Sequence, residues 1–340
     1  MPDANEMLEN NNTLFRFMCY GPEKTKKTWW VLRAAMDGFN VILFDADKGY
    51  DIVRQIPQQY RHKIIIVDIS DTLNVAKAAI FMTVLLKGDP IMWDEQAQKT
   101  IFNPEMADPE HSHLWLAPQQ FDKNTIVCFD SWTAITWSLA WRYAQQNMID
   151  LANASKTEWE GYRWCGALAD WMLNQIGNLP CHKVVVGHQT VYEKYREVQK
   201  GNKKERVLIS QKAIMKSTSG PHGLTVGAKF SDILRFYIKG SMYRIDAVAE
   251  EEEAGGTRII PPKVYDWDEL TWKKICEFSG VALPDAAAPI SGVKKFARGE
   301  TPVFENINTT ATPATNQVID GSDKKKSNAL ANLLKGKPQS

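Results

Sequence analysis

The sequence predicts an α/β fold in which a mostly parallel sheet carries helices on both faces. Three observations support this prediction: short, almost uninterrupted apolar runs recur along the chain, segments of helical length separate them, and polar residues follow each run. Strands that are buried on both faces are apolar throughout, and a helix is the usual connection between consecutive parallel strands.

This alternation continues through most of the first 190 residues. Gly38 is favourable just beyond the end of a helix, and Ser70-Asp71-Thr72 offers a cap at the start of the next one. In chain order we expect a strand over 15–20, a helix over 28–37, strands over 40–44 and 63–68, a helix over 73–86, a strand over 124–130, helices over 134–144 and 157–176, and a strand over 182–187. Beyond these we expect a helix or strand and then a paired strand within 230–245, and a strand-like stretch and a short helix within 257–280.

Residues 88–124 interrupt the alternation, because prolines recur there and no helical or strand period survives. We interpret this segment as an insertion, with a β-hairpin around 91–102. His111 and His113 are two residues apart in it, but no third metal ligand is near in the sequence. A polar surface loop is therefore preferred over a metal site.

The two ends of the chain differ in composition from the domain that we predict over 13–280. Residues 1–12 are polar and are expected to form a flexible lead. Residues 281–340 are rich in Pro, Ala, Thr, Asn and Gly, which predicts a largely disordered tail. A lysine triplet and the segment ALANLL predict one short amphipathic helix over 327–335, either as a docking segment for a protein partner or as part of a solubilising end.

Charge and cysteine usage exclude several classes of protein. The chain has 41 Lys+Arg and 40 Asp+Glu, so it has no overall basic field, and any contact with nucleic acid needs a local patch. The five cysteines are widely spaced without a C-x-x-C pair, which favours free thiols in a reducing compartment over disulfides or a metal centre. No apolar run approaches the roughly 18 residues of a membrane span, and the polar N-terminus lacks the pattern of a signal peptide. We therefore expect a cytoplasmic protein without membrane association.

The stretch between the first strand and the first helix has the spacing of a phosphate-binding loop. Gly21 is followed, after four residues, by Lys26-Lys27-Thr28, close to the P-loop pattern G-x-x-x-x-G-K-[ST]. In that pattern backbone N–H groups and the helix N-terminus surround the phosphates, the lysine contacts the β- and γ-phosphates, and the hydroxyl binds Mg²⁺. Lys27 and Thr28 take these roles, whereas Lys26 replaces the second glycine and adds a cation at the anion site. The predicted nucleotide-binding residues are Gly21, Pro22, Glu23, Lys24, Thr25, Lys26, Lys27 and Thr28, with ATP and Mg²⁺ as the expected ligands.

Polar residues also follow the other predicted strands, and the carboxyl ends of parallel strands share one edge of a sheet. Asp130 follows an apolar run and is expected to bind Mg²⁺, with Ser131 beside it to orient the carboxylate. Asp47 is the candidate that orients or deprotonates the attacking water, and Gln189 is the candidate that senses the γ-phosphate. Each residue alone is equally well explained as a turn or capping residue. Their joint placement favours a site that hydrolyses a nucleotide.

Four segments together give a more specific resemblance: GPE at 21–23 with Lys27-Thr28, FDAD at 44–47, IVCFDSWTAIT at 126–136 and VVVGHQ at 184–189. In this order they resemble the motif series of RecA-fold ATPases. In that family the second strand ends in Asp-Ala-Glu, the metal-binding strand in Asp-Ser, and the next strand in Asn-Gln ahead of a mobile DNA-binding loop. The resemblance covers about residues 13–245, and the chain is similar in size to the compact phage ATPases of single-strand annealing and recombination. It implies a RecA-like core, ATP hydrolysis and assembly of copies into a ring or filament.

By this resemblance, residues 190–219 are the loop that faces single-stranded DNA. Cations and aromatic rings along the segment suit sequence-tolerant binding of a single strand, and a solvated charged hairpin is the alternative interpretation. The predicted DNA-binding residues are Tyr192, Lys194, Tyr195, Arg196, Lys200, Lys203, Lys204 and Arg206. RecA-fold sites are completed across a subunit boundary, so the resemblance also implies a cation from a neighbouring copy. The candidates are Lys229, Arg235 and Lys239.

Two departures from the family pattern bear on catalysis. Asp47 is one methylene shorter than the usual glutamate, which is expected to slow hydrolysis or to require another acid such as Asp45. Lys26 stands at a glycine position, where a Cβ atom crowds the loop. The function we expect is an ATP-dependent, single-strand-binding ATPase in recombination, annealing or replication. A ring helicase and a nucleotide-binding scaffold with little or no hydrolysis are the alternatives that the sequence leaves open.

Overall fold

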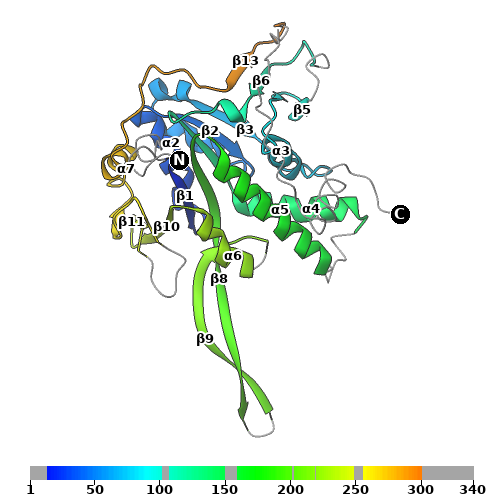
Figure 1. Ribbon diagram of the computed structural model, residues 1–340, viewed down its shortest axis with the longest axis vertical. Helices are drawn as coiled ribbons and strands as arrows, with labels where there is room; N and C mark the ends of the chain where they lie inside the picture. The colour runs from blue at the N-terminus through cyan, green and yellow to red at the C-terminus, as the bar shows by residue number, and fades with distance from the viewer. Residues whose placement is uncertain are drawn as a thin grey trace, which may run out of the picture.

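The computed structural model describes residues 14–101, 107–149, 159–200, 203–218, 220–248 and 256–300, and in it a mostly parallel sheet carries helices on both faces (Figure 1). The α/β class predicted from the sequence is confirmed. The strands are β1 (Arg16–Gly21), β2 (Asn40–Asp45), β3 (Ile64–Asp68), β4 (Ile91–Asp94), β5 (Lys99–Ile101), β6 (His113–Leu116), β7 (Thr125–Asp130), β8 (His182–Lys200), β9 (Lys203–Met215), β10 (Asp232–Lys239), β11 (Met242–Asp246), β12 (Val264–Asp266) and β13 (Val293–Phe296). The α-helices are α2 (Lys27–Leu32), α3 (Lys77–Leu85), α4 (Trp132–Gln146), α5 (Trp159–Asn178), α6 (Gly220–Val226) and α7 (Trp272–Ser279).

Nine strands of the described chain form the central sheet, in the order β12-β11-β10-β1-β8-β7-β2-β3, with β9 paired to β8. Strands β10 to β3 in this order are parallel, and β11 and β12 are antiparallel additions at one edge. The register aligns the polar strand ends. Asp45 of β2 lies opposite both Asp130 of β7 and Asp68 of β3. Gly21 of β1 lies opposite His188 of β8, so the candidate site residues share one edge of the sheet.

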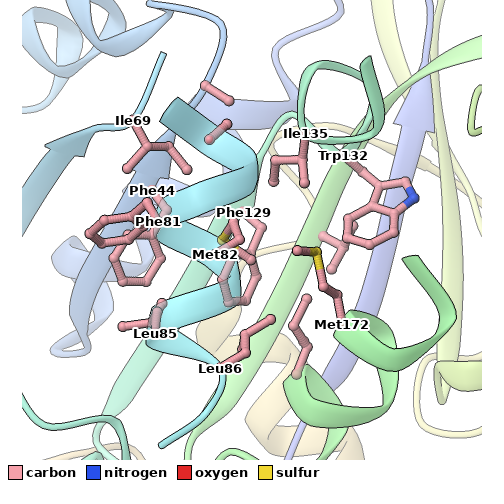
Figure 2. Packing of buried hydrophobic residues seen from close by; sticks show 14 of the residues in the cluster. Phe44, Ile69, Phe81, Met82, Leu85, Leu86, Phe129, Trp132, Ile135 and Met172 are labelled. Atoms are coloured by element: carbon pink, nitrogen blue, oxygen red, sulfur yellow. The ribbon is translucent and has the colours of Figure 1, made fainter. Parts of the chain in front are cut away.

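Two hydrophobic clusters, one on each face of the sheet, hold the layers together. Successive side chains of a strand point to opposite faces. Phe17 of β1 therefore packs in the cluster under α2 and α7, whereas Met18 packs in the cluster under α3, α4 and α5. Figure 2 shows part of the latter, where Phe44 and Phe129 from the sheet, 5.4 Å apart between ring centres, meet Met82 of α3.

The helices predicted over 134–144 and 157–176 are present as α4 and α5 with ends shifted by two residues, and two other helices differ more. The helix after the candidate phosphate loop is α-helical only as far as Leu32 and continues as a 3₁₀ helix over Arg33–Asp37. The helix predicted over 73–86 begins at Lys77, because Thr72 and Val75 pair in an isolated β-bridge that keeps this stretch out of the helix.

The hairpin predicted around 91–102 is present as β4 and β5, and it belongs to a second sheet with the order β13-β6-β4-β5. The expectation of a surface loop around His113 was wrong, since this residue lies in β6 and is buried. Its Nε2 is 3.9 Å from the buried Asp94 carboxylate, which also pairs with Nδ1 of His111 at 2.9 Å. A carboxylate buried behind both histidines is a tertiary feature that the local sequence does not reveal.

The predicted disordered tail was placed too early in the chain. Residues 293–296 form β13, which pairs with β6 of the insertion, so the structured part extends to at least residue 300. The predicted flexible lead over 1–12 and the rest of the predicted tail, with its helix over 327–335, lie outside the described residues.

Beyond the sheet, β8 and β9 continue as a two-stranded antiparallel ribbon that projects away from the rest of the protein (Figure 1). The pairing runs from Gln189 with Met215 to Lys200 with Lys203. The loop predicted over 190–219 is therefore mostly regular β-structure, and the alternative of a charged hairpin describes its backbone correctly. Polar residues on both faces leave no hydrophobic period, which is why the sequence did not indicate strands here.

All five cysteines are free and buried, as expected for structural thiols. Burial raises the pKa of both Cys165 and Cys276 to about 11, so these thiols remain protonated at neutral pH. In the described part of the chain, no helix has both the length and the apolar character that a bilayer crossing requires.

We expect His182, which is 1% exposed at the start of β8, to make a contribution to the stability of the fold that decreases in mild acid. Its Nδ1 accepts a hydrogen bond from the backbone N–H of Phe15, and burial lowers its pKa from 6.5 to about 4. The imidazole therefore stays neutral in the folded state while the unfolded chain takes up a proton. The contribution of His182 to the free energy of unfolding should fall by up to about 3 kcal/mol as the pH falls from about 6.5 to about 4. Urea unfolding of the unaltered chain and of His182→Gln across this range isolates this contribution, because the variant should gain stability relative to the unaltered chain as the pH falls. A difference between the two proteins that does not change with pH would contradict this assignment.

Candidate functional site

The segment from Gly21 to Thr28 forms a tight loop between β1 and α2, at the carboxyl edge of the parallel strands. Close packing requires glycine at its start, because a Cβ atom on Gly21 would lie 2.0 Å from the carbonyl oxygen of Phe236 in β10. The Thr25 hydroxyl donates to the carbonyl oxygen of Pro22 at 2.8 Å and closes the loop. The order of strand, loop and helix is the one that a P-loop requires.

Lys27 points into this loop rather than toward solvent. Its Nζ donates to the carbonyl oxygens of Pro22 at 2.7 Å and Gly21 at 3.1 Å, and the residue is 6% exposed. Burial lowers the pKa of the ammonium, and the nearby Asp130 carboxylate acts in the opposite direction. A phosphate group in the loop would give this buried cation a charged partner, which binds more strongly than neutral carbonyl oxygens.

The structure brings Thr28 and Asp130 together from elements that are far apart in the chain. The Thr28 hydroxyl, in the first turn of α2, donates a hydrogen bond to Oδ2 of Asp130 at the end of β7. Burial, assisted by the neighbouring acids Asp45 and Asp47, raises the pKa of Asp130 to about 6, although the bond from Thr28 and the charge of Lys27 oppose this shift. A buried carboxylate beside other acids is stabilised by a cation, so this position suits a metal ligand.

The oxygens of Thr28 and Asp130 fit Mg²⁺ that is held jointly with a nucleotide. Mg²⁺ prefers oxygen ligands, and it commonly takes one or two carboxylates together with the phosphates of a substrate. In the part of the chain that the structure describes, no three His, Cys, Asp or Glu side chains are arranged to hold a metal without such help. The residue that follows Asp130, Ser131, is joined to it by a cis peptide bond and caps α4 by accepting the backbone N–H of Ala134 at 3.2 Å.

Lys26 adopts the left-handed backbone conformation, with φ 64° and ψ 21°, which explains why the P-loop pattern has glycine here. Its ammonium does not enter the loop, contrary to the expectation of an extra cation at the anion site. It lies 4.2 Å from the ring centre of Tyr243 in β11 and 4.1 Å from that of Trp267, just after β12. Contacts of this kind contribute about 0.5–2 kcal/mol, similar to the about 1–2 kcal/mol that the left-handed conformation costs. Only the backbone of Lys26 lines the loop.

We expect the Lys26→Gly variant to be about as stable as the unaltered chain and the Lys26→Ala variant to be less stable. Glycine adopts positive φ without strain, which offsets the loss of the contacts with the two rings. Alanine loses the same contacts and keeps the strain, so its destabilisation should be about 1–2 kcal/mol. Thermal unfolding of both variants, followed by titration with ATP, checks this. An alanine variant as stable as the unaltered chain would contradict the role given to the rings, and one as stable as the glycine variant would contradict the strain assigned to the backbone of Lys26.

Asp47 is held beside β8 by the turn that follows β2. Asp45 is 1% exposed and accepts three backbone N–H groups of this turn, so it has a structural role rather than that of a spare acid. The turn brings Oδ2 of Asp47 to 3.0 Å from Nε2 of His188. Burial by itself would raise the pKa of Asp47, but the hydrogen bonds with His188 and Ser131 lower it below the ordinary value of 3.8. The carboxylate is ionised at neutral pH, as a general base must be.

A cleft of about 400 Å³ opens beside Asp47, between the turns after β2 and β3 and the start of α4. Its wall includes Asp71, Thr133 and the indole of Trp137, which is 64% exposed. Lys216, just beyond the end of β9, has its Nζ 5.8 Å from the centre of that ring. The cleft therefore extends from the candidate base toward the root of the ribbon.

Gln189, the candidate γ-phosphate sensor, pairs with Arg235. The Nε of Arg235 in β10 donates to Oε1 of Gln189 in β8 at 3.0 Å. Because β1 lies between these two strands, the bond spans the strand from which the phosphate loop begins. Arg235, one candidate for a cation supplied by a neighbouring copy, thus has a partner in its own chain. Of the other two candidates, Lys229 donates to Asn174 at 2.9 Å and Lys239 is exposed.

The root of the ribbon is attached to the start of α4, directly after β7. The Thr133 hydroxyl accepts the backbone N–H of His188 at 3.0 Å and donates to the carbonyl oxygen of Lys216 at 3.2 Å, so it joins both strands. The indole N–H of Trp132 donates to the hydroxyl of Ser217 at 3.1 Å. Sequence reasoning placed His188 at the end of a predicted strand but identified no partner for it or for Thr133, because the partners of both lie far away in the chain.

The residues predicted to bind DNA lie on the ribbon, but the structure does not gather them into one patch. Tyr192 is half-buried near the root, whereas Lys194, Tyr195, Arg196 and Arg206 are exposed. The side chains of Lys200, Lys203 and Lys204 lie outside the described part of the structure, although their backbones pair at the tip.

No protein-family model matches the chain, and no curated protein matches it.

Proposed function

We propose that this chain is a Mg²⁺-dependent P-loop ATPase of the RecA-like type that acts on single-stranded DNA. The observation that carries the proposal is the convergence of Lys27, Thr28 and Asp130 at the carboxyl edge of a parallel sheet. Ligands of open parallel sheets bind in the crevice at this edge. A buried lysine, a hydroxyl and a carboxylate around one loop are the groups that phosphoryl transfer requires.

In this proposal the loop over residues 21–28 surrounds the phosphates, and Lys27 exchanges its carbonyl partners for phosphate oxygens. Thr28 and Asp130 hold Mg²⁺, which supplies positive charge to the phosphates. Asp47, ionised and oriented by His188, accepts the proton of the attacking water. Lys26 keeps the loop in place through its contacts with the two aromatic rings.

The same strand links the candidate base to the ribbon. His188, which orients Asp47, belongs to β8, and β8 continues as one strand of the ribbon. DNA bound to the ribbon would therefore act on the strand that positions Asp47, the candidate general base. We expect slow hydrolysis of ATP without DNA and faster hydrolysis with it. As in the family that the sequence resembles, the protein is proposed to work as a ring or filament of copies.

The test is phosphate release from ATP by the full chain, with and without Mg²⁺ and with and without a single-stranded oligonucleotide. We expect hydrolysis that requires Mg²⁺ and increases with the oligonucleotide. Tight ATP binding without turnover would favour the scaffold alternative, and ATP-dependent separation of duplex strands would favour the ring helicase. Failure to bind ATP would contradict the proposal.

A further inference from the structure

The ribbon formed by β8 and β9 has two faces with different charges. Side chains alternate between the faces of a strand, and residues paired across an antiparallel ladder share a face. The register pairs Tyr192 with Lys212 and Glu193 with Gln211. Near the middle, Lys194 pairs with Ser210 and Tyr195 pairs with Leu208, so Ile209 is an extra residue that shifts the alternation of β9.

Because of this shift, Arg206, which pairs with Glu197, falls on the face opposite to Arg196. We call one side the basic face; its described polar residues are Thr190, Tyr192, Lys194, Arg196, Ser210 and Lys212. We call the other side the acidic face; its described polar residues are Gln189, Glu193, Tyr195, Glu197, Gln199, Arg206 and Gln211. The basic face thus has three cations and no acid among these residues, whereas the acidic face has two acids and one cation.

Hydrogen bonds support this assignment of the acidic face. The Tyr195 hydroxyl donates to Oε2 of Glu193 at 2.6 Å, and the side-chain amide of Gln211 donates to Oε1 of the same carboxylate at 3.0 Å. Both donors therefore lie on the side of Glu193. A phosphate approaching the Tyr195 ring would meet this carboxylate, and like charges at such a distance repel each other.

We propose that nucleic acid contacts only the basic face of the ribbon, with its phosphates along Lys194, Arg196 and Lys212. This inference rests on the proposed function, in which the chain binds single-stranded DNA, and it removes Tyr195 and Arg206 from the predicted contacts. The difference in charge indicates which face of the ribbon the nucleic acid contacts, since neutralisation of phosphates by cations supplies most of the sequence-independent affinity.

The basic face has a base-stacking partner at its root. Lys216 follows Lys212 by four residues and is exposed, and its Nζ lies 5.8 Å from the centre of the Trp137 ring. The indole is 64% exposed on α4, beside the cleft that leads to Asp47. Cations along a backbone path combined with an exposed ring are the features by which proteins bind single strands irrespective of sequence. Trp137 is therefore assigned as the ring on which one base stacks.

The experiment compares Arg196→Ala with Arg206→Ala in the full chain. The two arginines are exposed, lie on neighbouring positions of the ladder and point to opposite faces, so each variant removes the same charge from the same ribbon. Binding of a fluorescently labelled single-stranded oligonucleotide is followed by anisotropy at several salt concentrations. Arg196→Ala should weaken binding several-fold at low salt and reduce the slope of log affinity against log salt by about 0.7. Arg206→Ala should change the affinity less than about twofold.

Trp137 is tested in the same assay. Trp137→Ala should weaken binding by about tenfold with little change in salt slope, because stacking releases no counterions. Trp137→Phe keeps an aromatic ring and should therefore weaken binding much less than Trp137→Ala. Equal losses of affinity for Arg196→Ala and Arg206→Ala, or no loss for either, would contradict contact through the basic face alone. Such a result would not contradict ATP hydrolysis or DNA binding by the protein. Failure of the unaltered chain to bind the oligonucleotide would instead contradict the DNA part of the proposed function.

Discussion

Replacement of Lys27 by alanine is expected to lower ATP hydrolysis by about a hundredfold or more, the usual effect of removing one preorganised group that stabilises transition-state charge. The ammonium of Lys27 lies inside the loop, 2.7 Å from the carbonyl oxygen of Pro22. The neighbouring Lys26 does not substitute for it, since its own ammonium rests on Tyr243 and Trp267. Steady-state phosphate release at saturating ATP and Mg²⁺ measures the effect.

Lys87 provides the control for this variant. It is an exposed lysine beyond the end of α3, so Lys87→Ala removes the same charge without touching the loop. Because Lys27→Ala also removes hydrogen bonds to two loop carbonyls, thermal unfolding of both variants should accompany the assay. A Lys27→Ala protein that is folded and fully active would show that the loop does not bind the reacting phosphates.

The variant Asp130→Asn is expected to change activity and stability in opposite directions. Asparagine retains the size of the side chain and an oxygen that can accept from Thr28, but it has no charge for Mg²⁺, so hydrolysis should fall by about a hundredfold. In the folded chain burial raises the pKa of this carboxyl from 3.8 to about 6. Its ionisation therefore costs the folded state increasing free energy as the pH rises from about 4 to about 6, reaching about 3 kcal/mol at neutral pH. Without Mg²⁺ the variant should unfold several degrees higher than the unaltered chain.

The pH dependence of the stabilisation by Asp130→Asn distinguishes the loss of a buried charge from a change in side-chain packing. Near pH 4 the carboxyl of Asp130 is protonated in the folded chain, so the stabilisation by asparagine should largely disappear there and be largest near pH 7. Thermal unfolding without Mg²⁺ at both pH values, together with hydrolysis at pH 7, gives the comparison. A variant that loses both activity and stability would indicate that Asp130 supports the fold rather than a metal.

Local sequence patterns were sufficient for the elements that position this site. β1, β2 and β7 are nearly continuous apolar runs that end at Gly21, Asp45 and Asp130, so composition marks both the strand and its end. Once these strands are parallel, their carboxyl ends share one edge. The meeting of the loop with Asp130 was predictable for this reason, without knowledge of any tertiary contact.

Contacts between distant segments were not predictable in the same way. His188 and Asp47 are in contact although 141 positions separate them in the chain. The rings of Tyr243 and Trp267, which contact the ammonium of Lys26, lie in and just after the strands at one edge of the sheet. The ribbon strands are buried only at the root, at Ile214 and Met215, and have no hydrophobic period along the exposed part. The strand β13, with the sequence VKKF, is identified only by its pairing with β6. Each of these features depends on a partner that the local sequence does not specify.

We propose that a triphosphate lies over the loop that begins at Gly21, with its metal between Thr28 and Asp130. The most direct measurement is a structure of the full chain with Mg²⁺ and a non-hydrolysable ATP analogue. We predict phosphate oxygens in contact with Lys27 and a metal bound to the Thr28 hydroxyl on the side of Asp130. A nucleotide bound elsewhere, with Lys27 still hydrogen-bonded to the carbonyl oxygens of Gly21 and Pro22, would contradict the claim.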